Sequence, residues 1–115
     1  MLNIDNLRAF GANVDEGLAR CFKNESFYLR LVGMGLKDAN FDRLKEAMDN
    51  KDTAAAFEAA HALKGSLGNL ALTPLYRPVS ELTELLRGRS GPVEADALMA
   101  ELTAQLEKAR ALTKD

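Results

Sequence analysis

Hydrophobic residues recur at helical spacing along almost the whole chain. Apolar residues three or four positions apart share one face of a helix, which turns once in about 3.6 residues. Four short stripes of this kind precede residue 50: Ile4, Leu7 and Phe10; Val14, Leu18, Cys21 and Phe22; Phe27, Leu31 and Met34; Phe41, Leu44 and Met48. Each stripe predicts the buried face of a short helix. The first helix should end near Gly11, and Asp15, Ser26 and Asn40 are candidate N-caps of the other three.

Three longer helices are predicted after residue 50. The first is capped by Asp52 or Thr53 and runs through consecutive alanines to about Leu70. The second starts at Thr73-Pro74, and Pro78 should bend its first turns without ending it. The third opens at Pro92, after a turn over residues 88–91. The stripes expected to be buried in the last two helices are Leu75, Val79, Leu82 and Leu86, and Leu98, Leu102, Ala109 and Leu112.

No strand pattern, internal repeat or long linker interrupts these helices, so their apolar faces can be buried only against one another. We therefore expect an all-α fold, an antiparallel up-and-down four-helix bundle with short capping helices at its N-terminal side. The 115 residues, of which 47% are hydrophobic, suffice for one domain over residues 1–115 with a core that needs no metal or disulfide.

Charge and composition exclude several classes of function. The chain has 15 Lys+Arg against 17 Asp+Glu and a net charge of -2, without the basic excess of a nucleic-acid binder. It contains no stretch apolar enough to span a bilayer, and its start lacks the basic region and apolar run of a secretory signal. The single cysteine, Cys21, is expected to be a small buried residue. We expect a cytoplasmic protein, and Met1 favours a free-standing one.

The segment from 56 to 70 separates into two faces. At roughly 100° per residue, the apolar side chains gather opposite the only histidine, His61; they are Ala56, Ala60, Leu63, Leu67 and Leu70. Lys64, Gly65 and Gly68 share the face of His61, with Phe57 beside them. His61 should therefore point away from the core.

The polar face has the features of a phosphoryl acceptor. Two glycines on an exposed helical face cost about 1 kcal/mol each relative to alanine, so folding alone does not require Gly65 and Gly68. They provide bare backbone that another protein can approach. An imidazole near neutral pH is partly unprotonated and nucleophilic. Lys64, one turn after His61, can reach an anion attached to the ring.

The run His61-Ala62-Leu63-Lys64-Gly65-Ser66 resembles the signature of histidine-containing phosphotransfer (HPt) domains of multistep two-component phosphorelays. The pattern Phe41-x-x-Leu44, an aspartate (Asp52) before the Ala-rich helix and a Leu-rich helix after it are also similar, and the resemblance extends from about residue 20 to the end. Many members carry a further glycine near the position of Ala71, so this chain departs from the family there. This difference does not affect the acceptor, but it leaves open how a partner docks near the end of that helix.

By this resemblance, His61 is the phosphoaccepting residue, Lys64 supports the phosphoryl group, and Gly65 and Gly68 clear space for a receiver domain. Phe57 is either half-buried core or part of an apolar rim that the partner covers. The resemblance places Mg²⁺ on the receiver domain and implies no metal or other cofactor on this chain. The partners would be receiver domains of response regulators or hybrid histidine kinases, and the carrier would be a monomer.

Enzyme functions lack support in the sequence. It contains no Gly-rich phosphate loop, no His-Glu-x-x-His metal pair and no second histidine. We therefore expect a phosphorelay intermediate rather than an enzyme. Two alternatives stay open: a helical interaction module that binds a receiver or kinase without carrying phosphate, as scaffold or decoy, and a dimerising bundle resembling the phosphoacceptor domain of a kinase.

Overall fold

The computed structural model describes residues 1–88 and 92–114, with side chains at 92–94 left aside, and every regular element in this part of the chain is an α-helix. In chain order the helices are α1 (Ile4–Phe10), α2 (Val14–Arg20), α3 (Glu25–Gly35), α4 (Asn40–Asp49), α5 (Thr53–Asn69), α6 (Thr73–Gly88) and α7 (Pro92–Ala111). The all-α expectation is confirmed. The predicted turn at 88–91 falls almost wholly outside the described residues.

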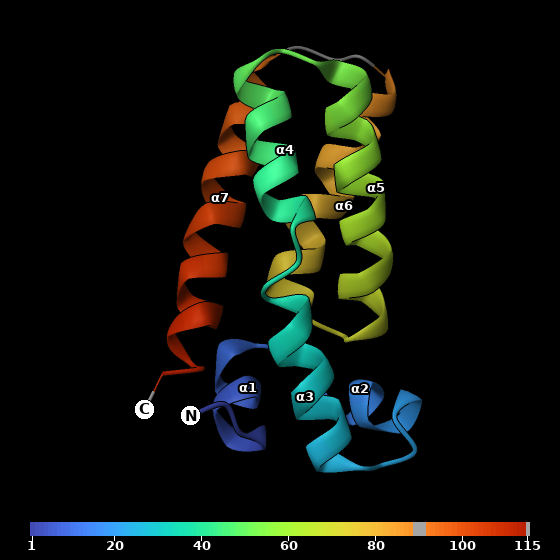
Figure 1. The fold of residues 1–115 in the computed structure, drawn as a ribbon, viewed down its shortest axis with the longest axis vertical. Helices are drawn as coiled ribbons and strands as arrows, with labels where there is room; N and C mark the ends of the chain where they lie inside the picture. Colours follow the sequence, from blue (N-terminus) through green and yellow to red (C-terminus); the bar gives the residue numbers. More distant parts are fainter. Residues whose placement is uncertain (89–91, 115) are drawn as a thin grey trace.

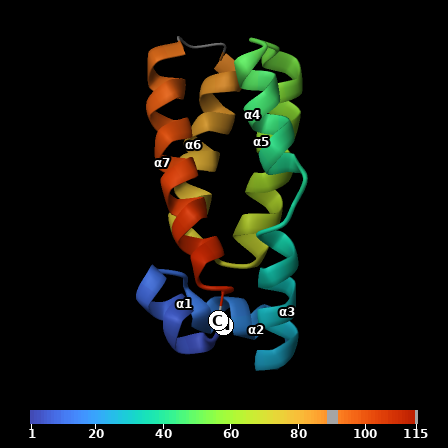
Figure 2. The ribbon, with the colours of Figure 1, turned by 60° about the vertical axis from the view of Figure 1, so that its left-hand side comes forward.

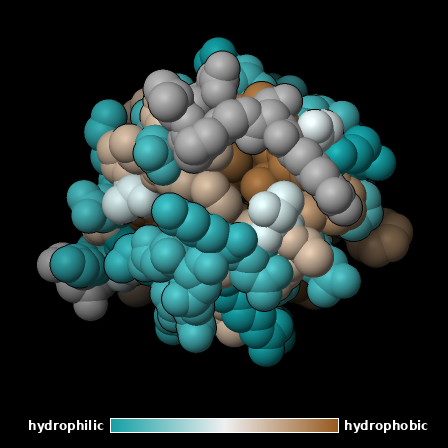
Figure 3. Space-filling model, turned by 90° about the horizontal axis from the view of Figure 1, so that it is seen from above, coloured by the Kyte–Doolittle hydropathy of each residue, from teal (hydrophilic) through white to brown (hydrophobic). Residues whose placement is uncertain are grey.

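The four later helices lie side by side along the long axis of the molecule (Figures 1 and 2). Helices α4 and α6 run toward the upper end in Figure 1, and α5 and α7 run away from it. Helix α5 packs against both α4 and α6, and α6 packs against α7. Helices α1, α2 and α3 gather at the lower end, where both termini lie. Seen from the upper end, hydrophilic residues form most of the rim, and hydrophobic residues show in the middle (Figure 3).

Asparagine and aspartate begin most of the helices. The N-caps of α1, α2, α3 and α5 are Asn3, Asn13, Asn24 and Asp52, and each side chain accepts a hydrogen bond from the backbone N–H three residues later. Of the two caps predicted for α5, Asp52 and Thr53, the structure has Asp52, and Thr53 is the first helical residue. Such a cap satisfies one of the otherwise unpaired N–H groups of the first turn, and is typically worth about 1 kcal/mol.

Three predicted caps are wrong. Asp15 lies inside α2, where it accepts a hydrogen bond of 2.7 Å from Arg8 that lowers the pKa of its carboxyl group. Ser26 lies inside α3, and Asn40 is the first helical residue of α4 rather than its cap. In α2 and α3 an asparagine shortly before the predicted cap takes the capping position, since Asn caps a helix as well as Asp or Ser.

The buried faces of the first helices match the prediction only in part. Leu7, Val14, Cys21, Phe41 and Leu44 are buried as predicted. Three residues that were predicted to be buried are exposed instead, namely Phe22, Phe27 and Met34, with exposed fractions of 91%, 37% and 62%. Phe22 follows the end of α2 and has a φ of 56°, so it no longer continues the helical stripe.

In α3 and its C-cap the buried stripe is Tyr28, Val32 and Leu36, one or two residues later than predicted. Tyr28 lies against Gly17 of α2, where a Cβ atom would come within 2.5 Å of the tyrosine ring. Its hydroxyl donates a buried hydrogen bond of 2.8 Å to the carbonyl of Leu70 at the end of α5. The inward position therefore goes to the aromatic residue that has a polar partner there, which a phenylalanine cannot use.

The later helices follow the predicted pattern closely. In α6, Leu75, Val79 and Leu82 are fully buried, and the helix continues through Pro78. In α7, Leu102 and Ala109 are buried, and Leu98 is half-buried. Among the described residues, no helix is both long and apolar enough to cross a membrane.

Candidate functional site

Helix α5 presents the two faces that its sequence predicts. Ala56, Ala60, Leu63 and Leu67 are buried against the neighbouring helices, and Leu70 is buried just after the helix ends. On the opposite side, His61 and Gly65 are exposed, and Phe57, Lys64 and Gly68 are half-buried. The structure therefore brings together all five residues that were proposed for the site.

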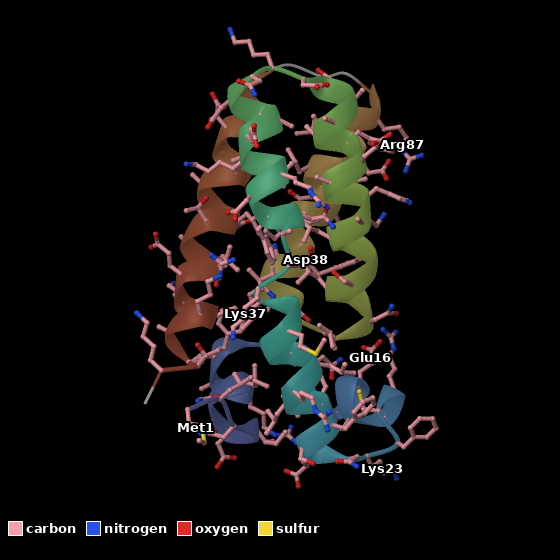
Figure 4. All side chains as sticks on the ribbon, viewed as in Figure 1. Met1, Glu16, Lys23, Lys37, Asp38 and Arg87 are labelled. Carbon is pink, nitrogen blue, oxygen red and sulfur yellow. The ribbon has the colours of Figure 1, made fainter. Side chains whose placement is uncertain are left out.

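The imidazole of His61 stacks on the ring of Phe57. The two ring centroids are 5.8 Å apart, and their planes differ by 17°. The guanidinium of Arg87, from α6, lies over the same phenyl ring at 5.2 Å from its centroid. Arg87 lies beside the upper half of α5 (Figure 4). Phe57 thus packs against the His61 ring without enclosing it, because His61 stays exposed to solvent and to a partner.

Two cations beside His61 share one carboxylate. The Nζ atom of Lys64 lies 3.8 Å from Oε1 of Glu84, and the Nε atom of Arg87 lies 3.4 Å from Oε2 of the same side chain. Glu84 and Arg87 are one turn apart on α6, which packs against α5. Lys64 therefore has a partner from the neighbouring helix, but its ammonium group is held only at the outer limit of an ion pair.

The two glycines of the polar face have different surroundings. A Cβ atom at Gly65 would meet no atom within 4 Å. At Gly68 it would lie 3.2 Å from Cε2 of Tyr76, a residue of α6. The carbonyl of Gly68 also accepts a 2.5 Å hydrogen bond from Arg20 of α2. The surface at Gly65 is therefore open to a partner, whereas Gly68 also serves the packing of α6 against the end of α5.

The turn after α5 connects the site helix to the N-terminal helices. Besides the Gly68 carbonyl, the Arg20 guanidinium donates a hydrogen bond of 2.6 Å to the carboxylate of Glu16. Glu16 lies just beyond the lower end of α5 (Figure 4). The carbonyl of Ala71 accepts a hydrogen bond of 2.9 Å from the backbone N–H of Asn13. Ala71 has a φ of 56°, in the left-handed region that favours glycine. The residue at which we expected a departure from the family therefore has the conformation that glycine adopts without strain.

The family model of the Hpt domain matches residues 38–112, well over half of the chain. The chain belongs to the Hpt domain family. The match begins at α4, later than the residue 20 from which we expected the resemblance to extend, and it contains all five proposed site residues. Neither a curated protein nor a solved structure matches the chain.

Membership of the Hpt family implies a role in phosphorelay signalling. Hpt domains carry phosphoryl groups between receiver domains of two-component systems and are not enzymes in the usual sense. In the described part of this Hpt domain, no group of three His, Cys, Asp or Glu side chains is placed to hold a metal ion.

Other helices contribute residues to the site that its sequence pattern does not predict. These are Arg20 from α2 and Tyr76, Glu84 and Arg87 from α6. The sequence of α6 does indicate that two of these residues lie on the surface. Glu84 and Arg87 are charged and lie off the buried stripe of α6, so the pattern places them on the surface. Which of them would face α5 depends on the rotation of α6 about its axis, and the sequence pattern leaves this rotation open within a wide range.

Proposed function

We propose that this Hpt domain is a phosphorelay intermediate in which His61 accepts a phosphoryl group from an aspartate of one receiver domain and passes it to another. The observation that supports this proposal most directly is the combination of an exposed imidazole with open helix backbone at Gly65, one turn along the same face.

The transfer is a substitution at phosphorus, and it needs no oxidant or reductant. An unprotonated ring nitrogen of His61 attacks the phosphorus atom, the bond from phosphorus to the aspartyl oxygen breaks, and a phosphorus–nitrogen bond forms. The receiver recovers its carboxylate, and the imidazole loses one proton to solvent over the whole reaction. The return step reverses these bonds with the aspartate of the second receiver. The receiver would supply Mg²⁺, whereas this chain provides the nucleophile and its geometry.

Each remaining site residue has a proposed role. Lys64 stabilises the phosphoryl group with its ammonium, one helical turn from the acceptor. Phe57 orients the imidazole by stacking and belongs to the apolar rim that a receiver domain covers. Gly65 lets the partner approach the backbone, and Gly68 extends this strip in addition to its contact with Tyr76.

The fold proposed for this function is one domain over residues 1–115. Helices α4 to α7 form its antiparallel up-and-down four-helix bundle, and the short N-terminal helices cap one end. We propose that it acts as a monomer in the cytoplasm, with receiver domains as partners rather than nucleic acid or a membrane.

The proposal is tested by mixing the full chain with a receiver domain labelled at its aspartyl phosphate, in the presence of Mg²⁺. Wild type should take up a base-stable, acid-labile label, and His61→Gln should bind the receiver with similar affinity but take up none. A His61→Gln variant that binds and signals like wild type would favour the scaffold or decoy instead. Sedimentation over a concentration series tests the monomer, since a kinase-like phosphoacceptor domain would dimerise.

A further inference from the structure

The carboxylate of Glu84 bridges the two cations that flank His61 along α5 and α6. Its contacts, 3.8 Å to Lys64 and 3.4 Å to Arg87, are longer than the roughly 2.7–2.9 Å of a strong charge-assisted hydrogen bond. The Glu84 and Arg87 side chains are more than half exposed. Loose, solvated ion pairs of this kind contribute little to folding. Stability therefore gives no strong reason for a carboxylate at this position.

The placement of Glu84 relates it to the acceptor. Phe57 and Lys64 lie one turn before and one turn after His61 on the same helix face. Arg87 contacts the first of them and Glu84 contacts the second, so the Glu84–Arg87 turn of α6 runs along the flank of His61. An anion on the imidazole that draws on Lys64, one turn away, would compete for it with the carboxylate of Glu84.

We infer that Glu84 is a positioning residue that pairs with Lys64 in the unphosphorylated protein, and that Lys64 leaves it for the phosphoryl group when His61 is phosphorylated. The inference rests on the proposed function. A phosphoryl group carries close to two negative charges and three strong acceptor oxygens, so it competes well against one carboxylate. The lysine stem is flexible and its three donors rotate, so Lys64 can change partner without movement of the helix.

This exchange limits how tightly the phosphoryl group is held. Part of the attraction of Lys64 for the phosphoryl group is spent on separating it from Glu84, and the nearby carboxylate also repels the new anion. Both effects raise the free energy of the phosphorylated state relative to a site without Glu84. The phosphoryl group therefore remains transferable to the next receiver, which a carrier requires.

The test compares Glu84→Gln with Glu81→Gln, each in the full chain. Both variants remove one negative charge from α6, but Glu81 makes no ion pair within the described residues. Each protein is mixed with a labelled receiver domain and Mg²⁺, and the ratio of phosphohistidine to phosphoaspartate is measured at equilibrium. We expect Glu84→Gln to raise this ratio about two- to fivefold, and Glu81→Gln to raise it by less than half as much. Thermal unfolding verifies that both variants are folded.

A double-mutant cycle identifies the route of the effect. In a Lys64→Gln background, Glu84→Gln should lose most of its gain, because no ammonium remains to be released. Equal ratios for Glu84→Gln and Glu81→Gln would overturn the inference and leave only an effect of net charge. A full gain without Lys64 would also overturn it. If wild type takes up the label but the two variants give equal ratios, only this inference is refuted. If wild type takes up no label, the proposed function is refuted as well.

Discussion

Replacing Gly65 with alanine should make the protein more stable and a poorer phosphorelay partner. Gly65 lies in the interior of α5, where glycine costs about 1 kcal/mol relative to alanine. A Cβ atom there meets nothing within 4 Å, so no steric term offsets the gain. We expect the free energy of unfolding to rise by about 1 kcal/mol, which for a domain of this size raises the melting temperature by about 4 °C.

The same methyl group would stand in the strip that a receiver domain approaches. Inserting a methyl group into a closely packed contact typically costs about 1–3 kcal/mol. We therefore expect the second-order rate constant of phosphoryl transfer to His61 to fall about tenfold or more. Circular dichroism at increasing temperature measures the melting temperature. A rapid-quench transfer assay with a labelled receiver domain measures the rate constant.

Gly68→Ala is the matched control for this prediction. Its Cβ atom would lie 3.2 Å from the ring of Tyr76, which must move to admit it. We expect this variant to be at least about 1 kcal/mol less stable than Gly65→Ala, because the ring displacement offsets the helix gain. Equal stability of the two variants would refute the packing distinction. An unchanged transfer rate in a stabilised Gly65→Ala protein would refute the proposal that a receiver domain approaches the backbone at Gly65.

Two further predictions concern stability alone. Ala71→Gly should stabilise the fold by about 0.2–1.2 kcal/mol, because relief of the left-handed conformation, about 1–2 kcal/mol, exceeds the lost burial of one methyl group, about 0.8 kcal/mol. Urea unfolding measures this difference, and destabilisation would contradict the prediction. Burial raises the pKa of Tyr28 to about 12. The protonated Tyr28 hydroxyl should therefore contribute on the order of 2 kcal/mol to the free energy of unfolding. This contribution is complete below pH 10 and is lost as the pH rises toward 12, and Tyr28→Phe should remove this pH dependence.

The site helix could be predicted from sequence because the forces that define it are local. Asp52 caps α5 through a bond to a backbone N–H three residues on, and the alanine-rich run favours the helix throughout. Its 17 residues give enough turns for the apolar side chains to define one face unambiguously. The positions of His61 and Lys64 on the opposite face followed from that periodicity alone.

The N-terminal helices were predicted less well because their orientation depends on distant residues. Helix α2 has only seven residues, so its stripe allows more than one phase. Tyr28 rather than Phe27 faces inward because Gly17 leaves space for its ring and Leu70 offers a carbonyl to its hydroxyl. Both partners come from other helices. A hydrophobic pattern read within one helix does not contain this information.

The same limit applies to the site. The two glycines of α5 look alike in sequence, and only the contact with Tyr76 separates an open position from a packed one. Likewise, the connection between Lys64, Glu84 and Arg87 requires the packing of α6 against α5. The residues proposed on the helix of His61 could be named from the sequence, whereas Tyr76, Glu84 and Arg87 could be placed beside them only from the tertiary structure.

The identity of the phosphorylated residue is the central claim, and site-resolved mass spectrometry tests it most directly. The full chain is incubated with a phosphorylated receiver domain and Mg²⁺, kept at alkaline pH to preserve phosphoramidates, and fragmented. We expect the mass of one phosphoryl group on His61 in the wild type and none in His61→Gln. A phosphoryl group on Ser66 or another residue, or binding of several receivers with no phosphoryl group on the chain, would contradict it.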